Sequence, residues 1–71
     1  MSEEITAPVS GTVWKIFVKV GESVQSDDEL MILEALKMEN AIYTPVDGKI
    51  AEIKVAVGDH VEANQLLIVI E

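Results

Sequence analysis

The sequence predicts an all-β fold: a flattened β-barrel or sandwich of two antiparallel sheets with internal pseudo-two-fold symmetry. Three observations predict it. The chain repeats itself with a period of 37 residues, so that Pro8 recurs as Pro45. Short segments rich in β-branched residues largely alternate between their two faces. Turn sequences separate these segments at intervals of about 8–12 residues, a spacing typical of small sandwiches and barrels.

The repeat aligns residues 7–34 with residues 44–71 without a gap, and 10 of the 28 aligned pairs are identical. The identities include residues that fix the shape of the backbone in turns. These are Pro8 and Pro45, Gly11 and Gly48, and Gly21 and Gly58. Halves that share turn residues are expected to share turns. Residues 1–71 are therefore predicted to form a single domain, in which two copies bury one common core.

Residues 13–20 and 50–57 are predicted to be equivalent strands, because both are rich in β-branched residues and largely alternate. In the first of them, the alternation places Val18 and Val20 on one face. Turns are expected on either side of each strand. Pro-Val-Ser-Gly and Val-Gly-Glu-Ser flank the first strand, and Pro-Val-Asp-Gly and Val-Gly-Asp-His flank the second.

Residues 27–39 favour a helix locally, since Leu, Met, Glu, Ala and Lys are good helix formers and the aspartates could cap its start. The repeat argues against a helix. It aligns residues 30–34 with the strand-like Leu-Ile-Val-Ile-Glu of residues 67–71, and tertiary context commonly overrides helix propensity. We therefore predict a strand over residues 31–34 with Met31 in the core, a turn near 36–38 and a strand from about 40 to 43.

Residues 35–43 link the two copies and are predicted to form a protruding hairpin. If Glu34 lies near Thr44, the pseudo-two-fold axis places Glu71 near Ala7. The two termini are then expected to lie together at one end of the molecule, with the hairpin at the other.

Composition excludes several classes of function. The chain has 13 acidic and 5 basic residues and a net charge of −8, so it is expected to repel nucleic-acid backbones. Its longest apolar runs, residues 30–33 and 66–70, are far too short to cross a bilayer, so no membrane insertion is expected. It has no cysteine, which removes disulfides and thiolate metal sites and fits a cytoplasmic location.

No catalytic constellation is evident. His60 is the only histidine, and it lies in a turn-like stretch where a solvated role is expected. Neither a zinc site nor a catalytic triad can be assembled around it. Trp14 and Phe17 have no aromatic equivalents in the second copy, so packing in or beside the core is expected of both. The sequence thus favours a small binding or carrier module over a catalyst.

The hairpin tip is unusual. Tight hairpins usually use Asn-Gly or Asp-Gly, whereas this tip reads Ala35-Leu36-Lys37-Met38. Apolar side chains at a protruding turn are costly unless a partner recognises them. The tip is therefore a candidate recognition site centred on Lys37.

From Ile5 to Glu71 the sequence resembles the biotinyl (biotin carboxyl carrier) domains of the biotinyl/lipoyl attachment family. The resemblance rests on the two Pro-Val-x-Gly turns, the two Val-Gly-[Glu/Asp]-x-Val turns and the hinge between the copies. The family's attachment motif is Glu-Ala-Met-Lys-Met. This chain matches it at Glu34, Ala35, Lys37 and Met38, and departs from it at Leu36, which replaces a methionine.

The resemblance implies a barrel-sandwich hybrid fold in which Lys37 is covalently biotinylated. Glu34, Ala35, Leu36 and Met38 would be recognised by a biotin protein ligase. The biotin arm would shuttle a carboxyl group between biotin carboxylase and carboxyltransferase sites of a biotin-dependent carboxylase, decarboxylase or transcarboxylase. Leucine for methionine nearly conserves volume, so folding should not suffer. In the family this methionine is linked more to the handling of partners than to attachment, which implies that the change bears on carboxyl transfer more than on attachment. Glu34 and Glu39 are expected to be solvated charges.

Two other functions remain open. A lipoyl domain shares the fold and hinge but typically carries Glu-Thr-Asp-Lys-Ala there, which differs from this chain on both sides of Lys37. An unmodified structural or protein-binding module of the same fold usually lacks the lysine. The mass of the adduct separates the two carriers, and replacement of Lys37 separates a carrier from a structural module.

Overall fold

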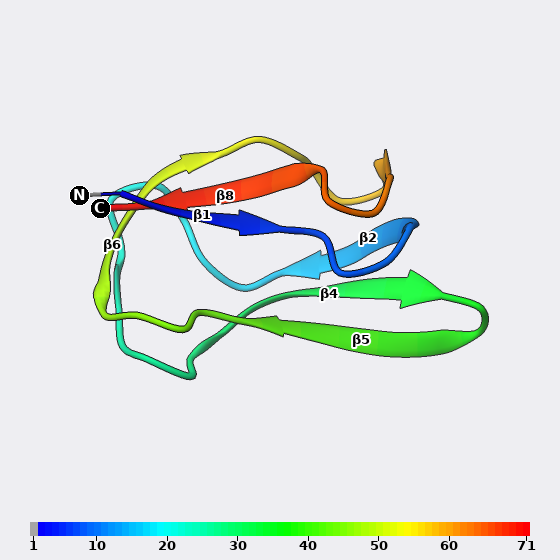
Figure 1. Ribbon diagram of the computed structural model, residues 1–71, viewed down its shortest axis with the longest axis horizontal. Helices are drawn as coiled ribbons and strands as arrows, with labels where there is room; N and C mark the ends of the chain where they lie inside the picture. The colour runs from blue at the N-terminus through cyan, green and yellow to red at the C-terminus, as the bar shows by residue number, and fades with distance from the viewer. Residues whose placement is uncertain (1) are drawn as a thin grey trace.

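The computed structural model describes residues 2–71, and within that range every regular element is a β-strand (Figure 1). The strands form two four-stranded antiparallel sheets, in the orders β1-β8-β6-β3 and β5-β4-β2-β7. Their bounds are β1 Glu3–Thr6, β2 Gly11–Ile16, β3 Ser23–Val24, β4 Glu29–Ala35, β5 Met38–Tyr43, β6 Gly48–Ile53, β7 His60–Val61 and β8 Leu66–Ile70. The predicted all-β fold of two antiparallel sheets is confirmed.

The 37-residue repeat reappears in the hydrogen bonds that join the two copies. The Gly21 N–H donates to the Ile50 carbonyl over 2.7 Å, and the equivalent Gly58 N–H donates to the Val13 carbonyl over 2.8 Å. The strand pairing shows the same relation, because β2 pairs with β4 and β7 as β6 pairs with β8 and β3. Each sheet is thus the pseudo-two-fold mate of the other, as the sequence predicts.

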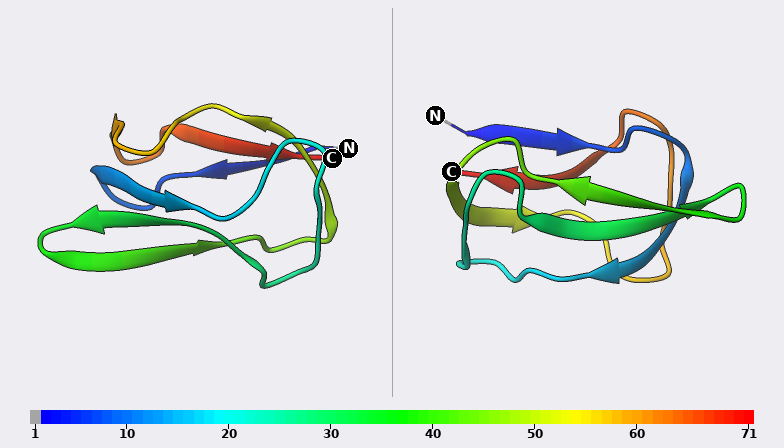
Figure 2. Two further views of the ribbon diagram at one scale, coloured as in Figure 1. Left: turned by 180° about the vertical axis from the view of Figure 1, so that it is seen from behind. Right: turned by 90° about the horizontal axis from the view of Figure 1, so that it is seen from below.

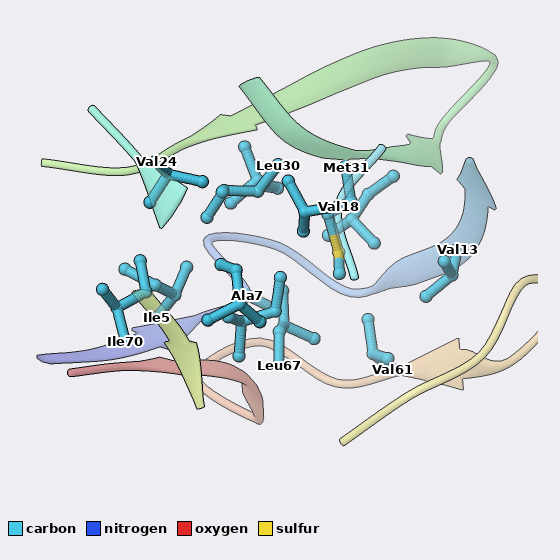
Figure 3. Close-up of a cluster of buried hydrophobic side chains, with 14 residues drawn as sticks. Ile5, Ala7, Val13, Val18, Val24, Leu30, Met31, Val61, Leu67 and Ile70 are labelled. Atoms are coloured by element: carbon cyan, nitrogen blue, oxygen red, sulfur yellow. The ribbon is translucent and has the colours of Figure 1, made fainter. Parts of the chain in front are cut away.

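The core lies between the two sheets and is built from both copies (Figure 3). Leu30 and its repeat equivalent Leu67 have no exposed surface, and Met31 is fully buried as predicted. The other members of the buried cluster are Ile5, Ala7, Val13, Val18, Val24, Leu33, Ile42, Ile50, Val61, Ile68 and Ile70. Because each copy covers the apolar face of the other, neither could bury this surface alone.

The predicted strand over residues 13–20 is too long. β2 ends at Ile16, and the chain then leaves its sheet to reach β3 in the other sheet. Val18 is buried during this crossing, whereas Val20 is 63% exposed next to a turn, so the two valines do not share a face. In the second copy β6 ends at Ile53, and the prediction for residues 50–57 is wrong for the same reason.

The helix-like segment forms strands, which confirms the argument from the repeat. β4 and β5 extend beyond the predicted ranges on the hairpin side, because Ala35 pairs directly with Met38. The turn therefore holds two residues only, Leu36 and Lys37.

The termini lie together at one end of the molecule and the β4–β5 hairpin projects from the other, as predicted (Figures 1 and 2). Glu3 pairs with Ile70 beside the termini. The expected proximity of Glu34 to Thr44 is wrong, because β4 and β5 run antiparallel along their whole length. Glu34 instead faces Glu39, and the Thr44 N–H donates to the Asp28 carbonyl over 3.0 Å.

Residues 2–71 include no helix long and apolar enough to cross a membrane.

Candidate functional site: the β4–β5 hairpin tip

The hairpin tip brings together all the residues that the sequence singles out. Glu34 and Ala35 end β4, Met38 begins β5, and Leu36 and Lys37 form the turn between them. Figure 2 shows this end of the hairpin reaching past the neighbouring loops. Lys37 therefore stands at the far end of the molecule from the termini.

The turn has the backbone of a glycine-rich hairpin without the glycine. Leu36 has a φ of 51° and Lys37 a φ of 64°, so both lie in the left-handed region, as a two-residue type I′ turn requires. That region costs a residue with a Cβ about 1–2 kcal/mol. Both strained residues, Leu36 and Lys37, belong to the segment that matches the attachment motif. Backbone strain of this kind is characteristic of functional sites, where the surrounding structure maintains it.

The apolar side chains at the tip point into solvent. Leu36 is 95% exposed and Met38 is 65% exposed, so neither folds back onto the core. Exposed apolar groups beside an exposed lysine offer a partner a hydrophobic contact and a reactive amine at one place. Among residues 2–71, no acidic side chain is paired with the Lys37 ammonium group. Its amine is therefore open to solvent.

The two faces of the hairpin differ in character. Glu34 and Glu39 lie directly opposite each other, and both are exposed. Like charges in this position repel. Because side chains alternate along a strand, Ala35, Met38 and Asn40 lie on the other face, which carries no charge. The acidic pair fits the expected role of solvated charges, since neither carboxylate has a hydrogen-bonding partner among the described residues.

Residues 1–70 match the family model described as "Biotin-requiring enzyme", which covers biotin and lipoyl attachment domains. The chain belongs to this family. The repeated turns and the two paired sheets described above are thus those of a chain of the biotinyl/lipoyl family.

Relatives of this biotinyl/lipoyl chain include carrier proteins and larger enzymes. It is 56% identical over 36 residues to the biotin carboxyl carrier protein of Streptococcus mutans, covering 51% of this chain and 28% of that protein. It is 53% identical over 36 residues to the methylmalonyl-CoA carboxyltransferase 1.3S subunit of Propionibacterium freudenreichii. This match covers 51% of this chain and 29% of that subunit. The chain therefore spans less than a third of these relatives' lengths.

Solved structures match the biotinyl/lipoyl fold over nearly the whole chain. The urea carboxylase of Kluyveromyces lactis superposes with a TM-score of 0.94 at 34% identity, covering 100% of this chain and 6% of that one. A single-chain, multi-domain long-chain acyl-CoA carboxylase superposes with a TM-score of 0.90 at 25% identity. This match covers 96% of this chain and 7% of that one. In both cases this fold is a small part of a much longer enzyme.

Gly11 lies against the base of the hairpin, next to Glu34 and Ala35, whereas its sequence context predicts only a turn. A Cβ at Gly11 would lie 2.6 Å from the Glu34 carbonyl oxygen and 3.2 Å from the Ala35 Cβ. Any side chain there would push β4 away from β2. The signal in the sequence was the recurrence of this glycine as Gly48, where a Cβ would lie 2.7 Å from the Glu71 oxygen.

The remaining candidates do not assemble a catalytic site. His60 is exposed as expected, but it lies in β7 and not in a turn, with its Nε2 3.6 Å from a carboxylate oxygen of Glu62. Trp14 and Phe17 are 41% and 47% exposed and are not among the residues packed against the core. The expectation that both pack in or beside the core is therefore wrong. Within residues 2–71, no group of three or more histidine and acidic side chains is placed to hold a metal ion.

Relief of the turn strain provides a test of this geometry. Asparagine tolerates the left-handed region better than leucine does, so Leu36→Asn is expected to stabilise the fold by about 1 kcal/mol. For a chain of this size, that corresponds to a rise in Tm of about 4–8 °C, measured by thermal unfolding. The control is Met38→Asn, since Met38 is in a strand and has no positive φ. An unchanged Tm for Leu36→Asn would show that the turn is not strained.

Proposed function

We propose that this chain is a biotin carrier and that Lys37 carries the biotin through an amide bond. One observation carries the proposal. In a chain of the biotinyl/lipoyl family, an exposed lysine with no ion-pair partner in the described part of the chain occupies the strained tip of the projecting hairpin, flanked by Ala35, Leu36 and Met38. The residues present fit the group, because the amine is accessible to a biotin protein ligase and its neighbours offer an apolar surface for recognition.

The proposed role is that of a swinging arm in a larger biotin-dependent enzyme. Attached biotin supplies the reversible carboxylation of a ureido nitrogen, which is chemistry of the cofactor. Matched relatives include a carboxyltransferase subunit and the gamma subunit of a glutaconyl-CoA decarboxylase. We propose that this chain likewise serves a biotin carboxylase site and a carboxyltransferase site in the cytoplasm, as a single non-catalytic carrier domain.

The chain's own residues contribute position and reach. The hairpin places Lys37 beyond the loops at that end of the molecule, and the paired strands down to Ala35 and Met38 keep its anchor stiff. The flexible lysine stem adds length to this anchor. Tethering makes the encounter with a second site effectively intramolecular, which raises the local concentration without any new contact. The termini lie at the opposite end, so a linker attached there would leave the tip free.

Attachment requires the Lys37 Nζ to act as a nucleophile. The amine attacks the carboxyl carbon of biotin that the ligase has activated as an acyl adenylate. A C–N bond forms, the C–O bond to the phosphate of AMP breaks, and the amine loses a proton. The side chains of Leu36 and Met38 are proposed to bind the surface of the ligase and so hold the hairpin tip in place for this reaction. Both are exposed before any partner binds.

The experiment that tests the proposal compares two ligases. The protein is incubated with a biotin protein ligase, ATP and biotin, or with a lipoate ligase, ATP and lipoate, and its intact mass is measured. We expect the mass of one biotinyl group to be added in the first reaction and no lipoyl group in the second. A lipoyl adduct without a biotinyl adduct would assign the chain as a lipoyl carrier. The absence of both adducts would favour an unmodified structural module.

A further inference from the structure

Two open grooves lie at opposite ends of the molecule. The hairpin groove, beside Lys37, has a volume of about 340 Å³ and is lined by Val9, Ser10, Ala35, Leu36, Met38 and Asn40. The terminal groove has a volume of about 300 Å³ and is lined by Ser2, Glu3, Val46, Asp47, Ile70 and Glu71.

The two grooves are related by the internal repeat. The 37-residue shift that superposes the copies turns Val9 into Val46 and Ser10 into Asp47. The same shift places Glu3 over Asn40. Each groove thus lies between the Pro-Val-x-Gly turn of one copy and the adjoining edge strand, β5 or β1. The equivalence covers these three positions only, because within residues 2–71 the shift gives no counterpart in the terminal groove for Ala35, Leu36 or Met38.

The grooves differ in charge. The terminal groove presents three carboxylates, from Glu3, Asp47 and Glu71. Within residues 2–71, no charged side chain lines the hairpin groove, although the chain as a whole carries a net charge of −8. The acidic pair of the hairpin lies on the opposite face of β4 and β5, away from this groove. The hairpin groove is therefore suited to an uncharged, largely apolar ligand, whereas the terminal groove is not.

We propose that the hairpin groove is a docking site for the ring system of the biotin attached to Lys37. This inference rests on the proposed function and goes beyond it, because a carrier needs only the tether. The ring system is uncharged, with an apolar thiolane ring and a polar ureido group. Val9, Ala35 and Met38 offer apolar contact to the thiolane.

Two polar side chains at the groove can hydrogen-bond the ureido group. Asn40 is partly buried, and its amide makes no hydrogen bond to the part of the chain that the structure describes. Ser10 Oγ donates to Glu62 over 3.0 Å and accepts from the Ala63 N–H over 3.2 Å, so it retains one acceptor position. In the proposed docking, one ureido N–H group donates to the Asn40 amide oxygen and the other to Ser10 Oγ. An open groove of this kind holds the ring between visits to the active sites and releases it when a partner docks.

The test compares the unmodified and biotinylated forms of the protein by NMR, after intact mass has verified complete modification. Docking predicts amide chemical-shift changes at Val9, Ser10 and Asn40, and nuclear Overhauser effects between ring protons and the Val9 methyl groups. Changes confined to residues 36–38 would overturn the inference. Failure to form the adduct would instead overturn the proposed function, and the mass measurement distinguishes the two results.

The repeat supplies a matched pair of variants for the same experiment. Asn40→Glu places in the hairpin groove the carboxylate that the equivalent position of the terminal groove already tolerates as Glu3. We expect it to abolish the shift changes at Val9 and Ser10 while the adduct mass remains. Glu3→Asn removes the carboxylate from the equivalent position of the terminal groove. It is expected to leave the shift changes at Val9 and Ser10 intact. Equal loss in both variants, or loss in neither, would contradict docking in the hairpin groove.

Discussion

Replacement of Lys37 by arginine is expected to reduce biotin incorporation to background. The guanidinium group keeps the positive charge but is not acylated by a ligase, so the variant removes the nucleophile with little other change. The fold is expected to be unaffected, because Lys37 is exposed and has no ion-pair partner among residues 2–71. Incorporation is measured by intact mass and by streptavidin blotting after reaction with a biotin protein ligase.

The matched control for this substitution is Lys19→Arg. Lys19 is also exposed and lies in a turn, where its carbonyl accepts from the Glu22 N–H over 3.0 Å. Full incorporation is expected in this variant. If Lys37→Arg kept substantial biotin incorporation, another of the five lysines would have to be the acceptor, and the assignment of the site would be wrong.

Truncation of the core is expected to have the largest effect on stability. Leu30 and Leu67 are repeat equivalents with no exposed surface, so Leu30→Ala and Leu67→Ala should each cost about 2–5 kcal/mol. A chain of 71 residues has a total stability of about 4–11 kcal/mol at typical values per residue. Each variant should therefore lose a large part of the free energy of unfolding, as measured by urea denaturation.

The shared core predicts that the two losses are similar and that unfolding stays a single transition. Val20→Ala and Val57→Ala are the matched controls, since these valines are also repeat equivalents and are each 63% exposed. Their effects are expected within about 0.5 kcal/mol of zero. Two separate transitions in either leucine variant would show that the copies unfold independently and do not stabilise each other.

The repeat made most of the fold predictable. Matching glycines and prolines in the two copies predicted matching turns, and the equivalent bonds of Gly21 and Gly58 show that the turns do match. The repeat also overruled the helix propensity of residues 27–39. It could not show where a strand ends. Val18 and Val20 alternate as in a strand, but the chain crosses between sheets there, and a pattern of period two does not register such a crossing.

The residues of the candidate site were predictable from the motif, but their geometry was not. Glu34, Ala35, Leu36, Lys37 and Met38 lie at one hairpin tip as expected. The left-handed backbone of Leu36 and Lys37 could not be predicted from the sequence, because neither residue type favours that region. It follows from the pairing of Ala35 with Met38, which leaves two residues to reverse the chain. The hairpin groove was also hidden, since it depends on how the Pro-Val-Ser-Gly turn packs beside β5.

Attachment of biotin to Lys37 is tested by locating the modification on the protein. The ligase-treated chain is digested, and the biotinylated peptide is sequenced by fragment-ion mass spectrometry. We expect one biotinyl group, attached to Lys37 alone. Biotin found on Lys15, Lys19, Lys49 or Lys54, or spread among several lysines, would contradict the assignment of the hairpin tip as the attachment site.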